Sequence, residues 1–149
     1  PQPTNPPRTM TTTDQLADLL AADLFADQPE TLAHSRRVAA YLGTEDGRAV
    51  ALLHDALEDT TATAAELVPV VGSRVVRAVQ ALTRSHSETY AEYVQRVADS
   101  GDPLAVAVKL ADLSDHFAQA DTLSDSLRSR YERARDVLTT AAIRACVDG

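Results

Sequence analysis

The sequence has little of several residue types, and each shortage excludes a class of protein. Its 149 residues include a single cysteine, Cys146, so no disulfide can form within the chain. A single thiol suits a reducing cytoplasm, where we expect the protein to be located. Tryptophan is absent and aromatic residues make up 4% of the chain, so the core must consist mainly of Ala, Leu and Val. That composition favours close-packed helices over a β-sandwich or a barrel.

Positive charge is also scarce, with 14 basic residues against 22 acidic ones and a formal net charge of −8. A domain that binds nucleic acid through phosphates normally carries the opposite balance, so we expect no nucleic-acid partner and no membrane-surface role. No apolar run approaches transmembrane length, and no charged-then-apolar signal segment opens the chain. A small molecule that carries phosphate is compatible with this charge, because a bound divalent cation can supply local positive charge.

What the chain does contain is apolar residues at the three-to-four spacing of amphipathic helices. Four of the seven prolines lie within residues 1–9, so we expect an irregular tail over residues 1–13 and one domain over residues 14–149. Helix periodicity and capping residues predict eight helices, at about 14–25, 29–42, 44–59, 63–72, 75–82, 88–98, 103–118 and 130–147. No strand alternation is sustained, so the sequence predicts an all-α domain of about seven or eight helices.

One stretch, ALLHDALEDT at residues 51–60, places a histidine and three carboxylates directly after an apolar run. Successive helical residues point about 100° apart, so His54 and Asp55 straddle one edge of the helix. Glu58 and Asp59 follow four residues later along that edge. Burying these carboxylates would be costly without a cation, and we therefore interpret the edge as part of a metal site. The alternative is a solvated helix end beside a hydrogen-bonded core histidine.

Two further candidate ligands lie in other predicted helices. His34 occupies the middle of the helix predicted over residues 29–42, and Asp112 lies in the apolar stretch VAVKLADL. An acid in so apolar a helix needs a counter-charge, which Lys109, three residues earlier, could also supply. Together with His54 and Asp55, these residues give two imidazoles and two carboxylates. Such a set suits Mn, Fe, Co, Ni or Zn better than Ca or Mg.

These residues form a pattern that resembles a known family. A histidine in mid-helix, then HD, then an aspartate in a later apolar helix resembles the H…HD…D signature of the HD-domain metal-dependent phosphohydrolases. The segments ALLHDALEDT, LTR and VKLAD, in this order, are closest to the RelA/SpoT-type (p)ppGpp hydrolase branch, whose pattern is HD-x-x-ED-T followed by K-L-A-D. The resemblance covers roughly residues 30–140.

The resemblance implies a compact HD-domain helical bundle and one divalent transition metal, with Mn²⁺ the first choice. The ligands that it implies are His34, His54, Asp55 and Asp112. It further implies that the acids of the ED pair, Glu58 and Asp59, are catalytic and handle the nucleophilic water.

The chain departs from the family pattern where the substrate would bind. The family's K-L-A-D-R-L-H-N reads KLADLSDH here, so that Leu113, Asp115 and His116 replace arginine, histidine and asparagine. The asparagine is a substrate contact in the family, and His116 could still donate a hydrogen bond to a sugar or phosphate. The segment G-Q-x-R-x-S-G-x-x-Y-x-x-H, which helps to seat the guanine nucleotide, is absent. We also predict substrate contacts for Tyr131 and for Arg37, for which a surface salt bridge is the alternative.

The sequence therefore predicts a stand-alone, metal-dependent phosphohydrolase that acts on a small-molecule nucleotide or related phosphate ester. Hydrolysis of the (p)ppGpp 3′-pyrophosphate and cleavage of a simpler nucleoside phosphate both remain open. The alternative from another class is a catalytically degenerate HD module that binds metal or nucleotide as a sensor or interaction domain. The intact ligand positions and ED pair argue against it. A third possibility is an HD-fold metal oxygenase. Such enzymes use two irons and additional histidine ligands, for which this chain, with four histidines, shows no evident candidates.

Overall fold

The computed structural model describes residues 2–3, 10–119, 121 and 123–148. Within these residues the chain forms nine α-helices and no β-strand, which confirms the predicted all-α class. Most of the predicted tail, residues 1 and 4–9, lies outside the described residues. The helices are α1 (Thr13–Leu24), α2 (Pro29–Ala40), α3 (Glu45–Leu53), α4 (Ala56–Asp59), α5 (Ala64–Val71), α6 (Ser73–Ala81), α7 (Tyr90–Asp99), α8 (Pro103–Ala118) and α9 (Asp125–Asp148).

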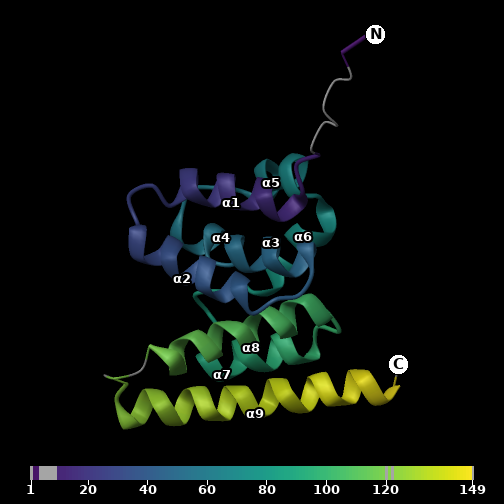
Figure 1. Cartoon of the computed structure of the whole chain (residues 1–149). Helices are drawn as coiled ribbons and strands as arrows, with labels where there is room; N and C mark the ends of the chain where they lie inside the picture. Colours follow the sequence, from purple (N-terminus) through teal and green to yellow (C-terminus); the bar gives the residue numbers. More distant parts are fainter. Residues whose placement is uncertain (1, 4–9, 120, 122, 149) are drawn as a thin grey trace.

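Helix α3 is the centre of the bundle. It packs against α1, α2, α6 and α8. Helix α8 joins this group of helices to α7 and α9, because it packs against α2 and α3 as well as against α7 and α9 (Figure 1). Residues carried by α2, α3 and α8 can therefore meet inside the molecule. None of the helices in the described part combines the length and hydropathy needed to span a bilayer.

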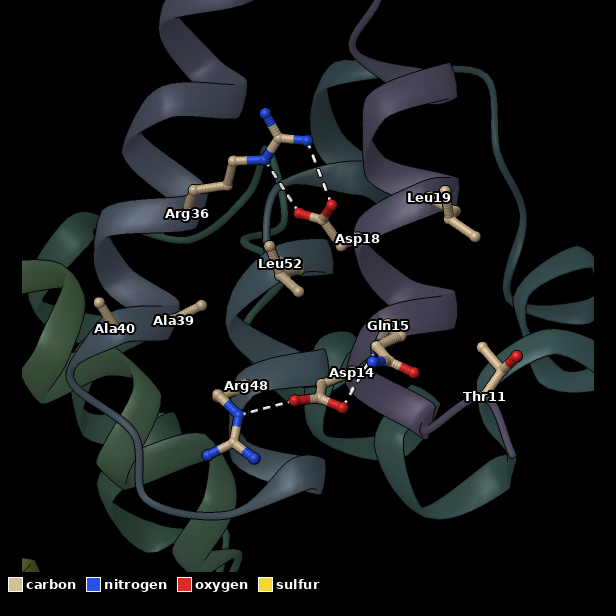
Figure 2. A pocket seen from close by; sticks show the side chains of 10 residues that line it. All are labelled: Thr11, Asp14, Gln15, Asp18, Leu19, Arg36, Ala39, Ala40, Arg48 and Leu52. Atoms are coloured by element: carbon tan, nitrogen blue, oxygen red, sulfur yellow. Dashed lines mark hydrogen bonds and ion pairs between the residues drawn. The ribbon is translucent and has the colours of Figure 1, made fainter. Parts of the chain in front are cut away.

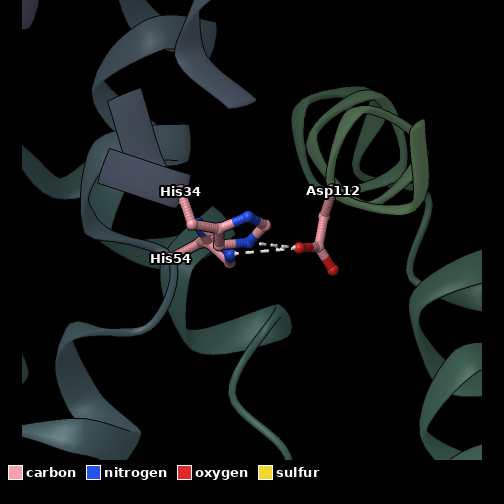
Figure 3. A group of neighbouring side chains, drawn as sticks. All are labelled: His34, His54 and Asp112. Atoms are coloured by element: carbon pink, nitrogen blue, oxygen red, sulfur yellow. Dashed lines mark hydrogen bonds and ion pairs between the residues drawn. The ribbon is translucent and has the colours of Figure 1, made fainter. Parts of the chain in front are cut away.

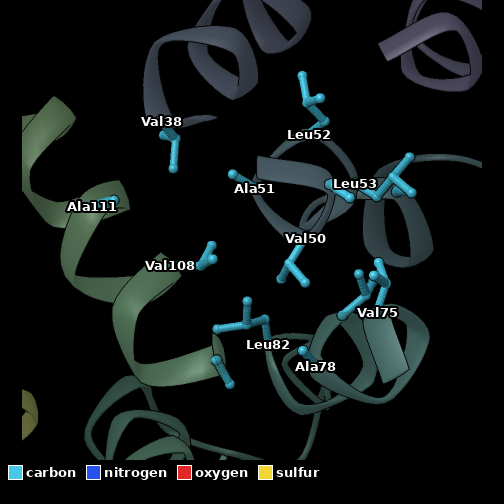
Figure 4. Close-up of a cluster of buried hydrophobic side chains, with 14 of the residues drawn as sticks. Val38, Val50, Ala51, Leu52, Leu53, Val75, Ala78, Leu82, Val108 and Ala111 are labelled. Carbon is cyan, nitrogen blue, oxygen red and sulfur yellow. The ribbon is translucent and has the colours of Figure 1, made fainter. Parts of the chain in front are cut away.

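The core is built from small and medium aliphatic side chains, as the composition predicts. Helix α3 contributes Val50 and Leu53, both fully buried, and they pack beside side chains from α2, α6 and α8 (Figure 4). Phe25 and Tyr93 are the two aromatic residues among the buried hydrophobic residues of the described part. Small side chains let helices approach closely, so the buried polar residues on α2, α3 and α8 are also brought close together.

Capping side chains fix where several helices begin. The hydroxyl groups of Thr44, Thr63 and Thr89 accept hydrogen bonds from backbone amides in the first turns of α3, α5 and α7. The Asp102 carboxylate does the same for α8, and Arg74 on α6 donates to it at 3.0 and 2.7 Å. Each cap satisfies amides that have no partner within the helix. The position of α8, which carries Asp112, is thereby tied to α6.

Two helix boundaries differ from the prediction. The helix predicted over residues 44–59 divides into α3 and α4 at His54 and Asp55. The carbonyl of Ala51 accepts from the backbone amide of His54 at 3.4 Å and pairs with its imidazole Nδ1 at 2.6 Å, so the regular i to i+4 ladder is interrupted there. The last helix begins at Asp125 rather than about residue 130, because Ser124 caps it through the Leu127 amide.

A surface hollow between α1, α2 and α3 contains none of the predicted site residues. Its charged side chains pair with one another: Arg36 with Asp18, and Arg48 with Asp14 (Figure 2). These pairs tie α1 to α2 and α3. The metal ligands predicted from the sequence lie elsewhere, on and beside α2, α3 and α8.

Candidate metal centre

Three of the predicted metal ligands come together between α2, α3 and α8. His34 lies on α2, His54 ends α3, and Asp112 lies on α8 (Figure 3). Each offers a ligand atom within 4.8 Å of the other two. His54 and Asp112 are 5% and 4% exposed, and His34 is partly buried. Three elements that are distant in sequence thus form a compact, buried set of nitrogen and oxygen donors that fits a divalent metal ion.

Both imidazole rings turn the same nitrogen toward Asp112. The Nε2 atoms of His34 and His54 lie 2.8 and 3.6 Å from Asp112 Oδ1. Their Nδ1 atoms have other partners, Asp115 Oδ2 for His34 and the Ala51 carbonyl for His54, both at 2.6 Å. A carbonyl or carboxylate oxygen only accepts, so His54 Nδ1 donates to Ala51, and a His34 ring that donates from Nδ1 to Asp115 likewise leaves its Nε2 facing Asp112. A neutral ring would then point a lone pair at the carboxylate, which is unfavourable unless a proton or a metal ion lies between them.

The charges at this centre are strongly coupled. Burial opposes the charged form of His54, but the charge of Asp55 and the contacts with Asp112 raise its pKa to about 9. Burial likewise opposes the charged form of His34, and its hydrogen bonds to Asp112 and Asp115 raise its pKa. Burial alone would raise the pKa of Asp112, yet Lys109 and the neighbouring imidazoles hold it well below its usual range. Positive charge from Lys109 and hydrogen bonds from the imidazoles therefore favour the ionised form of Asp112.

Lys109 provides the counter-charge that the sequence offered as an alternative to a metal. Its Nζ lies 2.6 Å from Asp112 Oδ2, and the pair is buried. The two oxygens of Asp112 therefore serve different partners, with Oδ2 on Lys109 and Oδ1 on the imidazoles. Asp112 can therefore form the predicted ion pair with Lys109 and still offer Oδ1 as the predicted metal ligand.

Two other predicted residues lie at the edge of the cluster. Asp55 Oδ2 is 3.3 Å from His54 Nε2, and the Asp55 side chain is 27% exposed. Its role as the fourth ligand stays a prediction, because the three-residue cluster does not include it. His116 Nε2 lies 3.4 Å from Asp112 Oδ1, and its ring stacks on that of His34 with centroids 5.1 Å apart.

The two acids of the ED motif lie on α4, directly after the break in the helix. Both are exposed and line a surface hollow together with Leu57 and residues 83–86. The Glu58 carboxylate accepts a hydrogen bond from the backbone amide of Arg84. Partial burial of the carboxyl group and the charges of Asp55 and Asp59 raise the pKa of Glu58, although the Arg84 amide opposes the rise. Partial burial and the charge of Asp55 also raise the pKa of Asp59.

The predicted substrate residues Arg37 and Tyr131 both adjoin the centre. Arg37 forms the salt bridge that the sequence offered as its alternative role, but the partner is the buried Asp115. Its Nε and Nη2 donate to that carboxylate at 2.9 and 3.1 Å, which leaves the Nη1 N–H groups and the second N–H of Nη2 for a phosphate contact. Tyr131 on α9 stacks on His116, with centroids 5.1 Å apart and planes 14° from parallel.

Asp115 is the residue of the centre to which the sequence assigned no role. It is 2% exposed and contacts both His34 and Arg37. A spacing signal existed, because Asp115 lies three residues after Asp112 just as Arg37 lies three residues after His34. Such pairs share a helix face. Their partners lie 78 to 81 residues away in sequence, so the spacing alone could not pair them.

The chain was compared with known proteins. No protein-family model matches it. A curated relative, described as a GTP pyrophosphokinase from Myxococcus xanthus, is 32% identical over 115 residues; the match covers 66% of this chain and 15% of the relative. A solved structure, described as a metazoan ortholog of SpoT that hydrolyzes ppGpp and plays a role in starvation responses, has a TM-score of 0.68. It is 22% identical, with 93% of this chain and 88% of that chain covered.

The structural match shows that the two chains share a fold. The curated match covers about 15% of the relative's length, so the chain spans only a small part of that relative. The resemblance to RelA/SpoT-type hydrolase domains, indicated by the HD, ED and VKLAD motifs, is confirmed by the two comparisons together.

Proposed function

We propose that the chain is a metal-dependent phosphohydrolase of the HD type that acts on a nucleotide or a related phosphate ester. The observation that carries the proposal is the shared orientation of His34 and His54. Both rings turn Nε2 toward one buried oxygen of Asp112, while Nδ1 is held by another acceptor. A histidine that is merely packed in a core needs no second histidine aimed at the same oxygen.

The donor set fits a divalent transition metal, and we propose Mn²⁺ as the first candidate. His34, His54 and Asp112 would hold the ion, with Asp55 as the proposed fourth ligand. When bound, such an ion polarises a phosphoryl oxygen and makes a water molecule a better nucleophile at neutral pH. Lys109 neutralises one side of Asp112, so the negative charge of the donor set is moderated before any substrate phosphate enters.

Glu58 and Asp59 are the proposed general bases. A base works best when its pKa lies near the operating pH, and the pKa of both carboxyl groups is raised here. Their exposure on α4, beside a hollow, leaves them accessible to water and substrate. Asp55 links them to the centre, because its charge raises the pKa of His54, Glu58 and Asp59 alike.

The substrate class follows from the comparisons and from the side chains around the centre. The fold neighbour is described as hydrolysing ppGpp, so (p)ppGpp is the first candidate substrate for this chain. His116 and Tyr131 stack as a pair that suits a base or a sugar, and Arg37 Nη1 suits a phosphate. A cytoplasmic location, expected from the single cysteine, accords with a nucleotide substrate.

A screen for released phosphate and pyrophosphate would test the proposal, since hydrolysis of the (p)ppGpp 3′-pyrophosphate releases pyrophosphate. The Mn²⁺-loaded chain is incubated with a panel of nucleotides that includes ppGpp, GTP and simple nucleoside monophosphates, with and without a chelator. We expect chelator-sensitive release from at least one of them. A chain that binds Mn²⁺ but releases neither phosphate nor pyrophosphate from any of them would be the degenerate sensor module instead.

A further inference from the structure

Helices α2 and α8 face each other with two polar residues on each, spaced three apart. His34 and Arg37 lie on α2, and Asp112 and Asp115 lie on α8. Residues three apart share a helix face, and all four side chains meet across the interface. The interface between α2 and α8 therefore carries a polar cluster that uses both members of each pair.

The His34 ring lies between the two carboxylates. Its Nδ1 is 2.6 Å from Asp115 Oδ2, and its Nε2 is 2.8 Å from Asp112 Oδ1. A neutral imidazole has one nitrogen that donates and one that accepts, and only the accepting nitrogen can bind a metal. Metal binding by His34 therefore depends on which of the two carboxylates accepts the hydrogen bond from its single N–H group.

Asp115 is well placed to accept that hydrogen bond. It is 2% exposed, and both of its oxygens accept hydrogen bonds from Arg37, at 2.9 and 3.1 Å. This bidentate pair fixes the carboxylate in place and balances its charge. Asp112 Oδ1, in contrast, is shared with His54 and His116 at 3.6 and 3.4 Å.

We infer that Asp115 is a positioning residue, braced by Arg37, that holds His34 as the Nδ1–H tautomer so that Nε2 faces the metal. The inference rests on the proposed function, because it assigns a role toward the metal of that centre. His54 is held in the same tautomer by a backbone carbonyl, that of Ala51. An outer carboxylate both orients a ligating histidine and strengthens it as a donor. The aspartate at position 115, a departure from the family pattern, thus acquires a function.

Mn²⁺ titration calorimetry on the full chain tests the inference with a matched pair of variants. Asp115→Ala should weaken Mn²⁺ binding by roughly 10- to 100-fold, the usual effect of losing an outer partner. Asp18→Ala is the control, since Asp18 forms a similar two-bonded pair with Arg36, also on α2, but in the separate hollow between α1, α2 and α3. It should bind Mn²⁺ like the wild type. Asp115→Asn should recover part of the lost affinity, because an amide oxygen can still accept from Nδ1.

A second readout reports on the ring itself. In Zn²⁺-loaded protein labelled with ¹⁵N-histidine, the wild type should show His34 protonated at Nδ1 and bound through Nε2. Asp115→Ala should lose this single state. If Asp115→Ala fails to fold by circular dichroism, Arg37→Gln replaces it, because it keeps the carboxylate and removes only its brace. Its Mn²⁺ affinity should fall severalfold.

The outcomes separate this inference from the proposed function. A wild-type chain that binds no Mn²⁺ would overturn the proposed function and the inference with it. Tight wild-type binding with equal affinity in Asp115→Ala and Asp18→Ala would overturn the inference alone. So would an unchanged His34 tautomer in Asp115→Ala, or an unchanged affinity in Arg37→Gln where that variant is used.

Discussion

The buried centre and the short helix α4 use the same kinds of charged group in opposite settings. At the centre, His54 and Asp112 are almost fully buried, and their polar atoms face one another or a fixed partner. On α4, Glu58 and Asp59 are exposed beside a hollow. A site that must hold an ion benefits from rigid, satisfied ligands, whereas a base must reach water and exchange its proton. The difference accords with the proposal that the first region binds the ion and the second transfers protons.

The causes of the pKa shifts show the same division. Charge partners prevail over burial at the centre, lowering the pKa of Asp112 and raising that of His54. On α4, burial and like charges act together and raise the pKa of Glu58 and Asp59. The centre is therefore arranged to keep its carboxylate ionised, and α4 is arranged to make its carboxylates better proton acceptors. Substitutions in the two regions should consequently have different effects.

The largest effect is expected at the centre. His54→Ala removes one of the two imidazoles and should abolish measurable metal binding and turnover, a greater loss than the roughly 10- to 100-fold caused by removing an outer partner. Metal analysis of the purified protein measures this directly. Asp55→Ala in parallel tests the proposed fourth ligand: lost metal would establish it, and full metal content would limit the protein ligands to the cluster of three. Unchanged metal in His54→Ala would remove the centre from the proposal.

A smaller effect, confined to turnover, is expected on α4. Glu58→Gln keeps the shape of the side chain but removes the base, so kcat should fall by roughly 10²- to 10⁴-fold. Metal content should stay at the wild-type level, in contrast to His54→Ala. Asp59→Asn should behave similarly if the two acids share the work. A Glu58→Gln, Asp59→Asn double variant within a few-fold of wild-type rates would show that α4 is only a solvated helix end.

Metal removal should also affect stability, because the ligands come from three different helices and the unfolded chain lacks the site. An ion present at 100 times its Kd stabilises the folded state by about 2.7 kcal/mol. For a chain of this size that corresponds to a rise in Tm of roughly 5 to 10 °C. Thermal unfolding with Mn²⁺ and with a chelator measures the shift. The His54→Ala protein is the control, since its Tm should not respond to Mn²⁺.

Much of this arrangement could be predicted from the sequence, because helix periodicity and capping residues are local. Thr63 and Asp102 begin helices where the pattern predicts, and His34, His54 and Asp112 meet as their motif predicts. The break at His54 could not be predicted, since it depends on a bond between the imidazole and the Ala51 carbonyl that an uninterrupted helix pattern conceals.

Two other features depended on information that the sequence does not display. The pairing of Asp115 with His34 and Arg37 joins segments about 80 residues apart, and it becomes visible only when α2 and α8 are packed together. The first turn of α9 is exposed and contains one apolar residue, Leu127, so it has no apolar stripe from which to predict a helix. Buried pairings and exposed helix starts are thus the features that the pattern of apolar residues does not specify.

The smallest effect concerns Asp102, a carboxylate in a third setting, because it caps α8 and pairs with Arg74 outside the centre. Burial alone would raise its pKa, but the hydrogen bonds from Arg74 lower it below the usual value. A lowered pKa in the folded state means that the pair stabilises the fold above the pKa of the unfolded chain, about 4. This stability is lost as the pH falls through the folded value. Asp102→Asn keeps a capping side chain but removes the charge.

The variant should therefore be less stable than the wild type at pH 7 by about 0.2–1 kcal/mol, the range for a partly exposed pair. The difference should shrink as the pH falls through the lowered folded pKa of Asp102 and vanish once that carboxyl group is protonated, because both proteins then carry a neutral side chain at position 102. Urea unfolding at several pH values measures this convergence, and Arg74→Gln combined with Asp102→Asn should cost little more than either change alone. A stability difference that persisted at low pH would mean that the cap, rather than the ion pair, holds the helix that presents Asp112 to the centre.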